Sequence, residues 1–247
     1  MSGVLENPKV TLVLLGAGFD PSVAIPERLG FAGVIRSDEA AAARFITLMP
    51  GQAVNFILDW CSVTVLNDRF IVETSVPPFI KIADLILKTL GDLMPKATVN
   101  MLGINRQYSL RFASAEALDD FGVRIAPPAA WGNWGRRIQE QLLADHTKNH
   151  GGVMNVTMRE TPIAGREIGW RDVQITSART GADGFVALIA LNDHFQANDA
   201  GQPPGLEPHE LGHRRTAAMM RIISEQFDDS LNVLESIAKD IVGSSPS

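Results

Sequence analysis

The sequence contains few of the residues that cross-link small domains or stack against nucleic acid. Cys61 is the only cysteine in 247 residues, so no disulfide can form within the chain. Because Cys61 sits in an apolar, strand-like stretch, we expect a buried thiol in a reducing cytoplasm rather than a nucleophile. Aromatic residues make up 6% of the chain and include one tyrosine, which leaves few rings for stacking against single-stranded nucleic acid.

No stretch of the sequence has the pattern of a membrane span or a signal peptide. Apolar runs stay below the roughly 18 residues that a membrane-spanning helix needs. Val10–Gly16 is too short to be the apolar core of a signal peptide. We therefore expect a cytoplasmic protein without a membrane partner.

The charge balance weighs against broad binding to nucleic acid. The net charge is −6, and the isoelectric point is near 5.4. Two arginine pairs, Arg136 with Arg137 and Arg214 with Arg215, are typical of solvated helix faces. A nucleic-acid-associated accessory role that uses these four side chains stays open as a third hypothesis.

The length and composition predict a mixed α+β fold. With 45% hydrophobic residues, the chain can bury about 70–75% of its unfolded surface without a metal or a disulfide. Strands followed by a long helix occur twice along the chain. We therefore expect one domain over residues 1–247 in which two antiparallel-sheet-plus-long-helix halves, residues 1–145 and 151–247, pack around a shared core. The polar stretch His146–Gly152 marks the boundary between these halves.

Hydrophobic periodicity locates the individual elements. Alternating or continuous apolar runs predict strands, the first of them fully buried, at Val10–Leu15, Ala53–Asp59, Ser62–Leu66, Arg69–Ser75, Val99–Leu102, Tyr108–Phe112, Val153–Arg159, Trp170–Ser177 and Gly184–Asp193. Spacings of three and four predict helices at Ser37–Phe45, Pro78–Leu93, Ser114–Phe121, Ala129–Leu143 and Leu211–Val242. One apolar stripe, which we expect to pack in the core, contains Trp131, Trp134, Ile138 and Leu142.

The sharpest chemical motif is His209-Glu210-Leu211-Gly212-His213. Side chains four apart on a helix share a face, so His209 and His213 could bind one zinc while Glu210 acts as general base. A catalytic zinc needs a third protein ligand, and the sequence offers none at the spacing of an extended zinc-peptidase motif. The alternative interpretation is a solvated helix start with Glu210 near the positive end of the helix dipole.

Other short patterns predict less. Gly16-Ala17-Gly18 follows a strand, but the third glycine of a dinucleotide-binding turn is missing and Pro21 interrupts the expected helix. His146 and His150 form a second pair four apart, within a polar loop. The sequence lacks a Gly-x-Ser-x-Gly nucleophile elbow and a phosphate-binding loop.

Asn105 and Arg106 form a polar pair inside an apolar region that otherwise has strand character. Buried polar groups need hydrogen-bond partners. We expect the pair to bond neighbouring backbone or an acid such as Asp84. A contact with a ligand or partner is the alternative for these two residues.

The chain resembles a sporadically distributed family of uncharacterised bacterial proteins. The matching stretches are Phe19-Asp20-Pro21, Asp68–Glu73, Pro78–Leu93, Ile104-Asn105-Arg106, Phe185–Asp193, and Met219–Asp229 with Phe227. The resemblance covers most of the chain and implies no established activity or catalytic residue. It also implies that the histidine-containing insertion before the last helix is a variable loop.

Because no catalytic constellation is complete, we expect a non-enzymatic binding or assembly protein of a bacterial cytoplasmic complex. A protein partner or self-association would use an exposed strand, either Tyr108–Phe112 or Val153–Arg159. The alternative is a zinc-dependent hydrolase with His209 and His213 as ligands and Glu210 as the base. No cofactor other than this zinc is expected.

Overall fold

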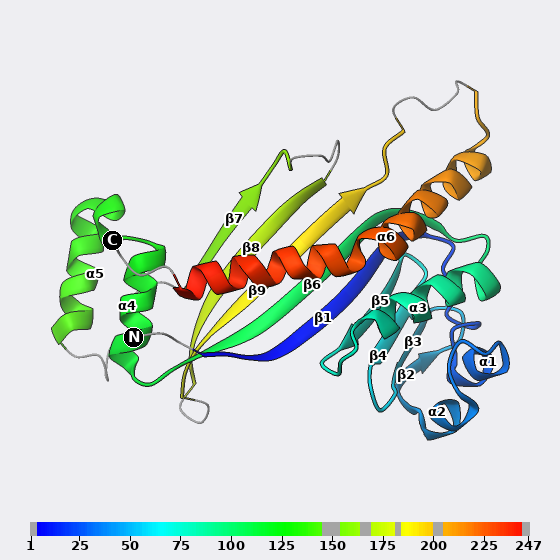
Figure 1. Ribbon diagram of the computed structural model, residues 1–247, viewed down its shortest axis with the longest axis horizontal. Helices are drawn as coiled ribbons and strands as arrows, with labels where there is room; N and C mark the ends of the chain where they lie inside the picture. Colours follow the sequence, from blue (N-terminus) through cyan, green and yellow to red (C-terminus); the bar gives the residue numbers. More distant parts are fainter. Residues whose placement is uncertain (1–3, 145–153, 164–168, 181–183, 200–204, 244–247) are drawn as a thin grey trace.

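A single antiparallel sheet forms the body of the protein. The computed structural model describes residues 4–144, 154–163, 169–180, 184–199 and 205–243. The sheet has nine strands in the order β2-β3-β4-β5-β1-β6-β9-β8-β7 (Figure 1). The strands are β1 (Val4–Ala17), β2 (Arg44–Met49), β3 (Ala53–Ile57), β4 (Ser62–Leu66), β5 (Arg69–Thr74), β6 (Thr98–Phe112), β7 (Asn155–Glu160), β8 (Gly169–Thr180) and β9 (Gly184–Gln196).

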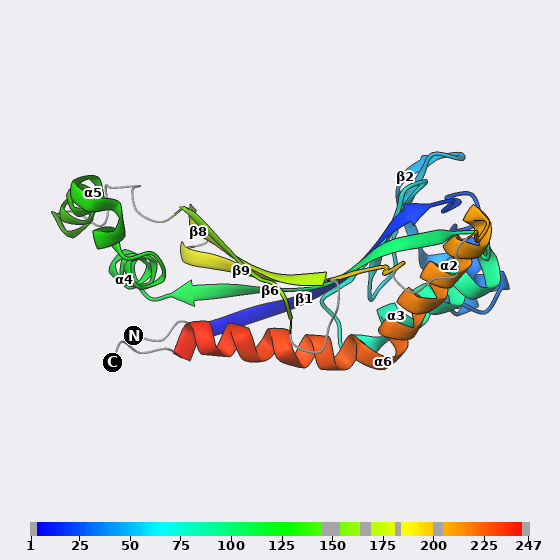
Figure 2. The same ribbon diagram turned by 90° about the horizontal axis from the view of Figure 1, so that it is seen from above.

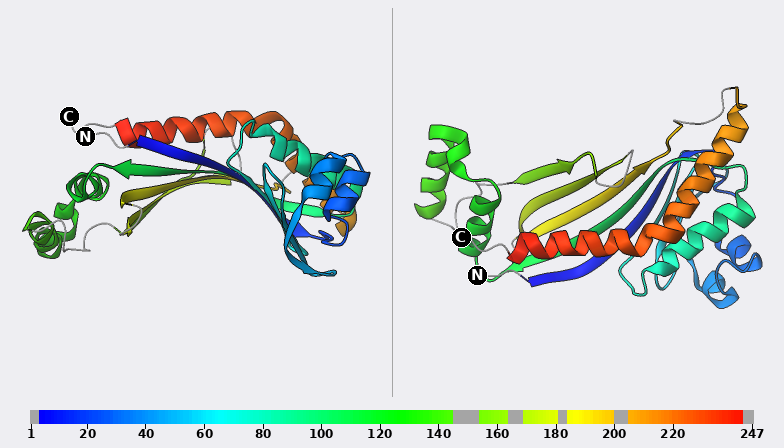
Figure 3. Two further views of the ribbon diagram at one scale, coloured as in Figure 1. Left: turned by 90° about the horizontal axis from the view of Figure 1, so that it is seen from below. Right: turned by 45° about the horizontal axis from the view of Figure 1, so that its top comes forward.

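The helices lie at the ends of the sheet and on one of its faces. They are α1 (Pro26–Phe31), α2 (Ser37–Ala42), α3 (Ile80–Lys88), α4 (Ala115–Ile125), α5 (Gly132–Ala144) and α6 (Pro208–Gly243), with a π-helical turn at Thr89–Leu93 and a 3-10 turn at Pro128–Trp131. α4 and α5 lie beyond one end of the strands, and α1 to α3 lie at the other end (Figure 3). No helix in the described part of the chain is long and apolar enough to cross a membrane.

Helix α6 runs along one face of the central strands. Its buried residues recur every three or four positions from Gly212 to Ala238, which gives the helix one continuous inward stripe. Met219, Ile223 and Phe227 join the larger core with β1 and β3 to β6. Leu234 and Ala238 join a second core with α4 and strands β6, β8 and β9. No described helix covers the opposite face of these strands, and the sheet curves between the two ends of the molecule (Figure 2).

Several predicted elements are confirmed. The predicted strands Ser62–Leu66 and Arg69–Ser75 are β4 and β5, which form a hairpin with its turn at Asn67-Asp68. The helix predicted from Ser114 is α4, and the Ser114 hydroxyl caps it by accepting a hydrogen bond from the backbone N–H of Ala117 at 3.2 Å. The predicted helix Leu211–Val242 lies within α6. The predicted boundary His146–Gly152 lies outside the described residues.

Strand β1 is longer and less buried than its apolar run indicates. Val10, Leu12 and Leu14 are fully buried, whereas the residues between them are half-exposed. Successive side chains of a strand point to opposite faces of the sheet, so a strand that packs against a core on one face buries only every second side chain. The expectation of a strand buried on both faces was therefore wrong, because only one face carries a helix.

The two strands predicted at Val99–Leu102 and Tyr108–Phe112 are parts of one strand. β6 continues without interruption from Thr98 to Phe112 and pairs with β1 on one side and β9 on the other. Tyr108–Phe112 is consequently a central segment and cannot pair with another chain. A polar residue in a strand does not end it when its neighbours supply partners.

The segment predicted as one helix from Ser37 to Phe45 divides into two elements. α2 ends at Ala42, and Phe45 lies in β2, which the sequence analysis missed. The N-cap is Arg36 rather than Ser37, because the Glu39 carboxylate accepts a hydrogen bond from the backbone N–H of Arg36 at 2.9 Å.

The tryptophan stripe does not pack in the core as expected. Trp131 and Trp134 are 59% and 55% exposed. They contact each other edge to face, with ring centroids 6.0 Å apart. The helix that carries Trp134 projects beyond the sheet instead of lying on it (Figure 3).

The strands of both predicted halves belong to one sheet. β9 from the second half pairs directly with β6 from the first half. The larger core likewise contains Phe195 and Phe227 beside residues of β1 and β3 to β6. The mixed α+β class is therefore confirmed, while the division into residues 1–145 and 151–247 stays a prediction.

Buried polar contacts join α6 to the strands beneath it. The hydroxyl of Ser230 donates to Asp193 at 2.7 Å, and Asp193 lies 3.6 Å from a guanidinium nitrogen of Arg171. Further toward the N-terminus of the helix, the Thr216 hydroxyl donates to the carbonyl oxygen of Ala97 at 2.9 Å. These contacts fix the position of α6 because buried polar groups are costly to leave without partners.

We expect Asp193→Ala to destabilise the protein by about 1.5–3 kcal/mol, because it removes the buried carboxylate that Ser230 and Arg171 contact, while Arg171 keeps its bond to Glu160. Urea unfolding measures the free energy of unfolding. Lys239→Ala is the control, since Lys239 forms an exposed pair with Glu235 and should cost less than about 0.5 kcal/mol. A loss below about 1 kcal/mol for Asp193→Ala would contradict a stabilising role for this contact.

Candidate functional site

Strand β7 forms one free edge of the sheet. It pairs with β8 and with no other strand of the described residues. The predicted exposed strand Val153–Arg159 largely coincides with β7, so the expectation that this segment lies at an edge is confirmed. An edge strand has unpaired backbone groups that can bond another chain. Pairing of β7 with a partner stays a prediction.

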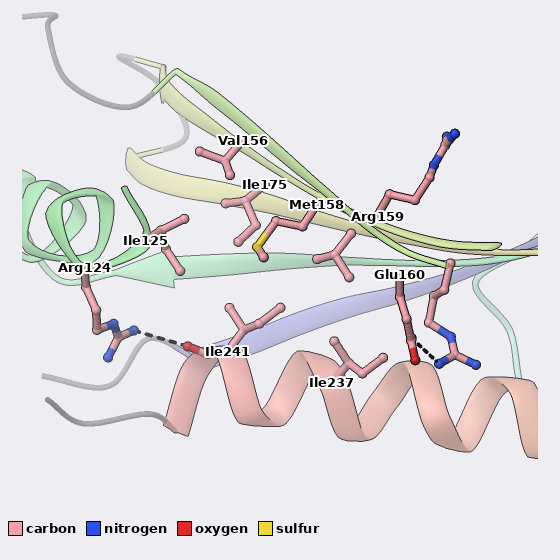
Figure 4. A pocket seen from close by; sticks show the side chains of 11 residues that line it. Arg124, Ile125, Val156, Met158, Arg159, Glu160, Ile175, Ile237 and Ile241 are labelled. Atoms are coloured by element: carbon pink, nitrogen blue, oxygen red, sulfur yellow. Dashed lines mark hydrogen bonds and ion pairs between the residues drawn. The ribbon is translucent and has the colours of Figure 1, made fainter. Parts of the chain in front are cut away.

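An apolar trough lies between β7, β8 and the end of α6 (Figure 4). It has a volume of about 420 Å³. Its floor is formed by side chains of β7 and β8, and its walls are formed by α6 and α4. The apolar lining residues, which define the trough, are Ile125, Val156, Met158, Val173, Ile175, Ile237 and Ile241.

The trough exists because the sheet is wider than the helix that covers it. α6 lies over β6 and β9. The next strands, β8 and β7, have apolar side chains on the same face of the sheet, and α6 covers them only in part. Met158 is 71% exposed although it lies on the same face of the sheet as buried Ile175. An apolar side chain of this size, left open beside other apolar residues, marks an interaction surface.

Charged groups border the trough at its two ends. At one end Arg171 donates to Glu160 at 2.9 Å. At the other end Arg124 donates to the backbone carbonyl of Ile241 at 3.3 Å (Figure 4). The trough is therefore apolar along its length and polar at its ends, which is the usual arrangement of a protein-binding surface.

A polar and aromatic cluster lies on the opposite face of the same strands. Arg159 donates two hydrogen bonds to Asp172, at 2.7 and 2.8 Å. The Trp170 indole N–H donates to the same carboxylate at 3.1 Å. Trp170 is sandwiched between the Arg159 guanidinium, 4.9 Å from its centre, and the His194 ring at 4.8 Å.

The charges of this cluster follow from its contacts. The hydrogen bonds from Arg159 hold the pKa of Asp172 below its ordinary value. Burial lowers the pKa of His194, although the nearby Asp172 carboxylate opposes this effect. His194 is therefore neutral at pH 7, and its 3.7 Å approach to Asp172 is not an ion pair at that pH. The cluster holds β7, β8 and β9 together rather than presenting a free charge.

Asn105 and Arg106 point to opposite faces of β6. The acid that binds Arg106 is Glu235 of α6, at 2.8 Å, and the expectation of Asp84 was wrong. Arg106 also donates to the carbonyl of Leu231 at 3.3 Å, as the expected backbone contact. It is buried beneath α6, where it acts in packing.

Asn105 lies on the face away from α6. Its side-chain oxygen is buried without a hydrogen-bond partner in the described part of the chain. A Cβ atom built on the neighbouring Gly103 would lie 3.4 Å from this oxygen and 3.8 Å from a ring nitrogen of His194. A ligand or partner contact at Asn105 stays a prediction.

The histidines of the zinc motif lie on the exposed surface of the first turns of α6. His209, Glu210 and His213 are all exposed. The helix packs through Gly212 instead, where a Cβ would meet the Thr98 hydroxyl at 2.6 Å. Within the described residues, no group of three or more histidine, cysteine, aspartate or glutamate side chains is placed to hold a metal. His146 and His150 lie outside the described residues.

The two arginine pairs lie far apart. Arg136 and Arg137 belong to α5, whereas Arg214 and Arg215 belong to the start of α6, at the opposite end of the molecule (Figure 1). Arg215 also pairs with Asp199. These positions do not combine the four side chains into one basic groove.

Cys61 and Gly16, which is the second-last residue of β1, are explained by packing. Cys61 is buried, as expected, and burial raises the pKa of its thiol to about 12. This thiol is therefore protonated and unreactive at neutral pH. Gly16 lies where a Cβ would overlap the backbone oxygen of Thr98 at 1.7 Å, so close strand pairing requires a glycine there.

The sequence analysis did not identify the trough or the Arg159–Asp172 cluster. Their residues come from β7, β8, β9, α4 and the end of α6, which are separate segments of the chain. The available signal was the alternation in β7, where Val156 and Met158 face one side and Thr157 and Arg159 the other. No family model matches the chain, and the curated proteins include no match to it.

The zinc hypothesis predicts about one zinc per chain in untagged protein, measured by metal mass spectrometry. His209→Ala should remove this zinc. His194→Ala, which changes the histidine that stacks on Trp170, is the control and should leave the zinc in place. Protein purified without zinc, and unable to take it up on addition, would exclude the hydrolase.

Proposed function

We propose that the protein is a non-enzymatic binding or assembly protein of a bacterial cytoplasmic complex. Its binding site is β7 together with the trough, and its partner contributes an extended segment of chain. The observation that carries this proposal is the apolar trough that opens directly beside an unpaired edge strand. Recognition by strand addition combines these two features.

The geometry of β7 favours an extended segment over a compact ligand. The outer backbone groups of an edge strand can pair with a second strand, which supplies hydrogen bonds independent of sequence. Every second side chain of the added strand then faces the trough, next to Val156 and Met158. The trough volume, about 420 Å³, lies in the range of specific binding pockets, about 300–1,000 Å³.

The apolar lining supplies the affinity in this proposal. Burying one large apolar side chain contributes about 1.5–3 kcal/mol, and about 1.4 kcal/mol corresponds to a tenfold change in affinity. Two alternate side chains of the added strand in the trough therefore contribute about 3–6 kcal/mol, which is a gain of roughly 10²- to 10⁴-fold in affinity over the same strand without them. The polar ends near Arg124 and Glu160 limit how far an apolar segment extends.

The proposal predicts a sequence pattern in ligands selected from random peptides displayed on phage, with the full chain immobilised. Selected peptides should alternate apolar and polar residues over five or six positions, because strand addition places alternate side chains in the trough. Fluorescence anisotropy with a labelled selected peptide measures the affinity.

Two neighbouring residues of β7 provide a matched pair of variants. Met158→Asp places a charge on the trough side and should weaken binding at least tenfold. Thr157→Asp places the same charge on the opposite side of the strand and should change binding less than threefold. Both side chains are exposed, so neither change should unfold the protein. Selected peptides without alternation, or equal effects of the two variants, would contradict the proposal.

A further inference from the structure

The other free edge of the sheet, β2, has a different character. Its large side chains are exposed on both faces of the strand: Phe45 is 41%, Ile46 62%, Leu48 53% and Met49 48% exposed. Phe45 and Leu48 lie beside Phe56 and Val54 of β3 on the side of the core. Ile46 is the extra residue of a β-bulge. In the described residues, β3 is the one strand that pairs with β2.

Such an edge is unusual for a strand that stays in water. Natural edge strands are protected by charged side chains, prolines or cover from another element. β2 has one charged residue, Arg44, at its first position. The bulge at Ile46 bends the strand but leaves its apolar side chains exposed. The edge therefore has the composition of a buried interface rather than of a solvated surface.

The direction of the strands favours a second copy as the partner. All neighbouring pairs in the nine-stranded sheet are antiparallel, so the first and last strands, β2 and β7, run in the same direction. A head-to-tail contact that keeps both α6 helices on one face would pair β7 with β2 in parallel. A two-fold axis perpendicular to the sheet instead pairs β2 with β2 in antiparallel fashion. Antiparallel pairing is the commoner arrangement, and a two-fold contact closes without forming a fibre.

The charges of β2 are compatible with this self-pairing. Antiparallel pairing places the two copies of Arg44 at opposite ends of the joined strands, where they do not oppose each other. The strand has no other charged side chain. Like charges directly opposite would be destabilising, and this arrangement avoids them.

The exposed area is close to what a stable dimer needs. With about 180 Å² for a fully exposed side chain, within the range for an aromatic residue, the four apolar residues expose roughly 370 Å² in each copy. Eight such side chains expose about 740 Å² in two copies, and the paired backbones and the flanking Arg44 and Thr47 add to the area that a dimer buries. Specific interfaces need about 1,000 Å² or more in total.

We infer that β2 is a homodimer interface, in which the sheets of two copies join edge to edge through antiparallel β2 strands. This interface is independent of the proposed binding function at β7. β2 and β7 are the opposite edges of the sheet. A dimer through β2 therefore leaves both β7 edges free and carries two binding sites for extended segments.

Sedimentation equilibrium of the full chain at tens of micromolar tests the inference. The wild-type protein should have twice the 26.8 kDa mass of one chain. Leu48→Glu places a charge in the joined edge and should shift the protein to the monomer mass. Val233→Glu makes the same type of change at a residue of α6 that is 40% exposed, and it should leave the dimer intact. Circular dichroism checks that each variant is folded.

Single cysteines locate the contact. Thr47→Cys and Leu48→Cys lie near the middle of β2, and at least one of them should form an intermolecular disulfide on mild oxidation. Thr157→Cys on β7 should not, and buried Cys61 is unreactive in all of these proteins. A monomeric wild type, a dimer that survives Leu48→Glu, or cross-linking through residue 157 alone would overturn the inference. None of these outcomes removes peptide binding at Met158, which is measured separately.

Discussion

The position of α6 on the sheet decides which surfaces of the protein remain open. Buried polar contacts hold the helix over the central strands: Thr216 bonds the backbone ahead of β6, and Ser230 bonds Asp193 of β9. Between them Met219, Ile223 and Phe227 join the larger core. Because one helix cannot cover nine strands, the apolar side chains of β7 and β2 extend beyond it. The trough is a direct consequence of this placement, whereas β2 lies at the far edge of the sheet, beyond the core that β3 to β5 share with α1 and α3.

The fold class and most elements follow from the sequence because their signals are local. Alternation predicted the β4–β5 hairpin, and helical spacing predicted α6. β2 was missed because α2 leads directly into it, so the alanine-rich start extended the predicted helix to Phe45. β6 was predicted as two strands because the polar pair Asn105 and Arg106 interrupts its apolar pattern. The partner of Arg106, Glu235, lies 129 positions later in the chain, and no local pattern reveals such a contact.

The candidate site was predictable in position but not in form. An exposed strand at Val153–Arg159 was expected, and β7 lies at the edge of the sheet. The trough beside it depends on Ile237 and Ile241 of α6, whose distance from β7 is set by the packing of the whole sheet. Trp134 shows that a correctly predicted helix does not fix what the helix packs against. Its spacing correctly predicted a helix, but α5 projects beyond the sheet and the ring stays exposed. Periodicity identifies an apolar face and leaves open what covers it.

The central claim is that one sheet carries two open edges with different partners. Hydrogen exchange of the wild-type protein, measured by mass spectrometry at low and at high protein concentration, tests it most directly. Amides of β6 should exchange slowly at both concentrations, and those amides of β7 that do not pair with β8 should exchange rapidly at both. The exchange rate of the β2 amides should fall as the protein concentration rises, because the edge becomes paired in the dimer. If β2 and β7 both exchanged as slowly as β6 in dilute protein, the edges would be covered within one chain and the account would be wrong.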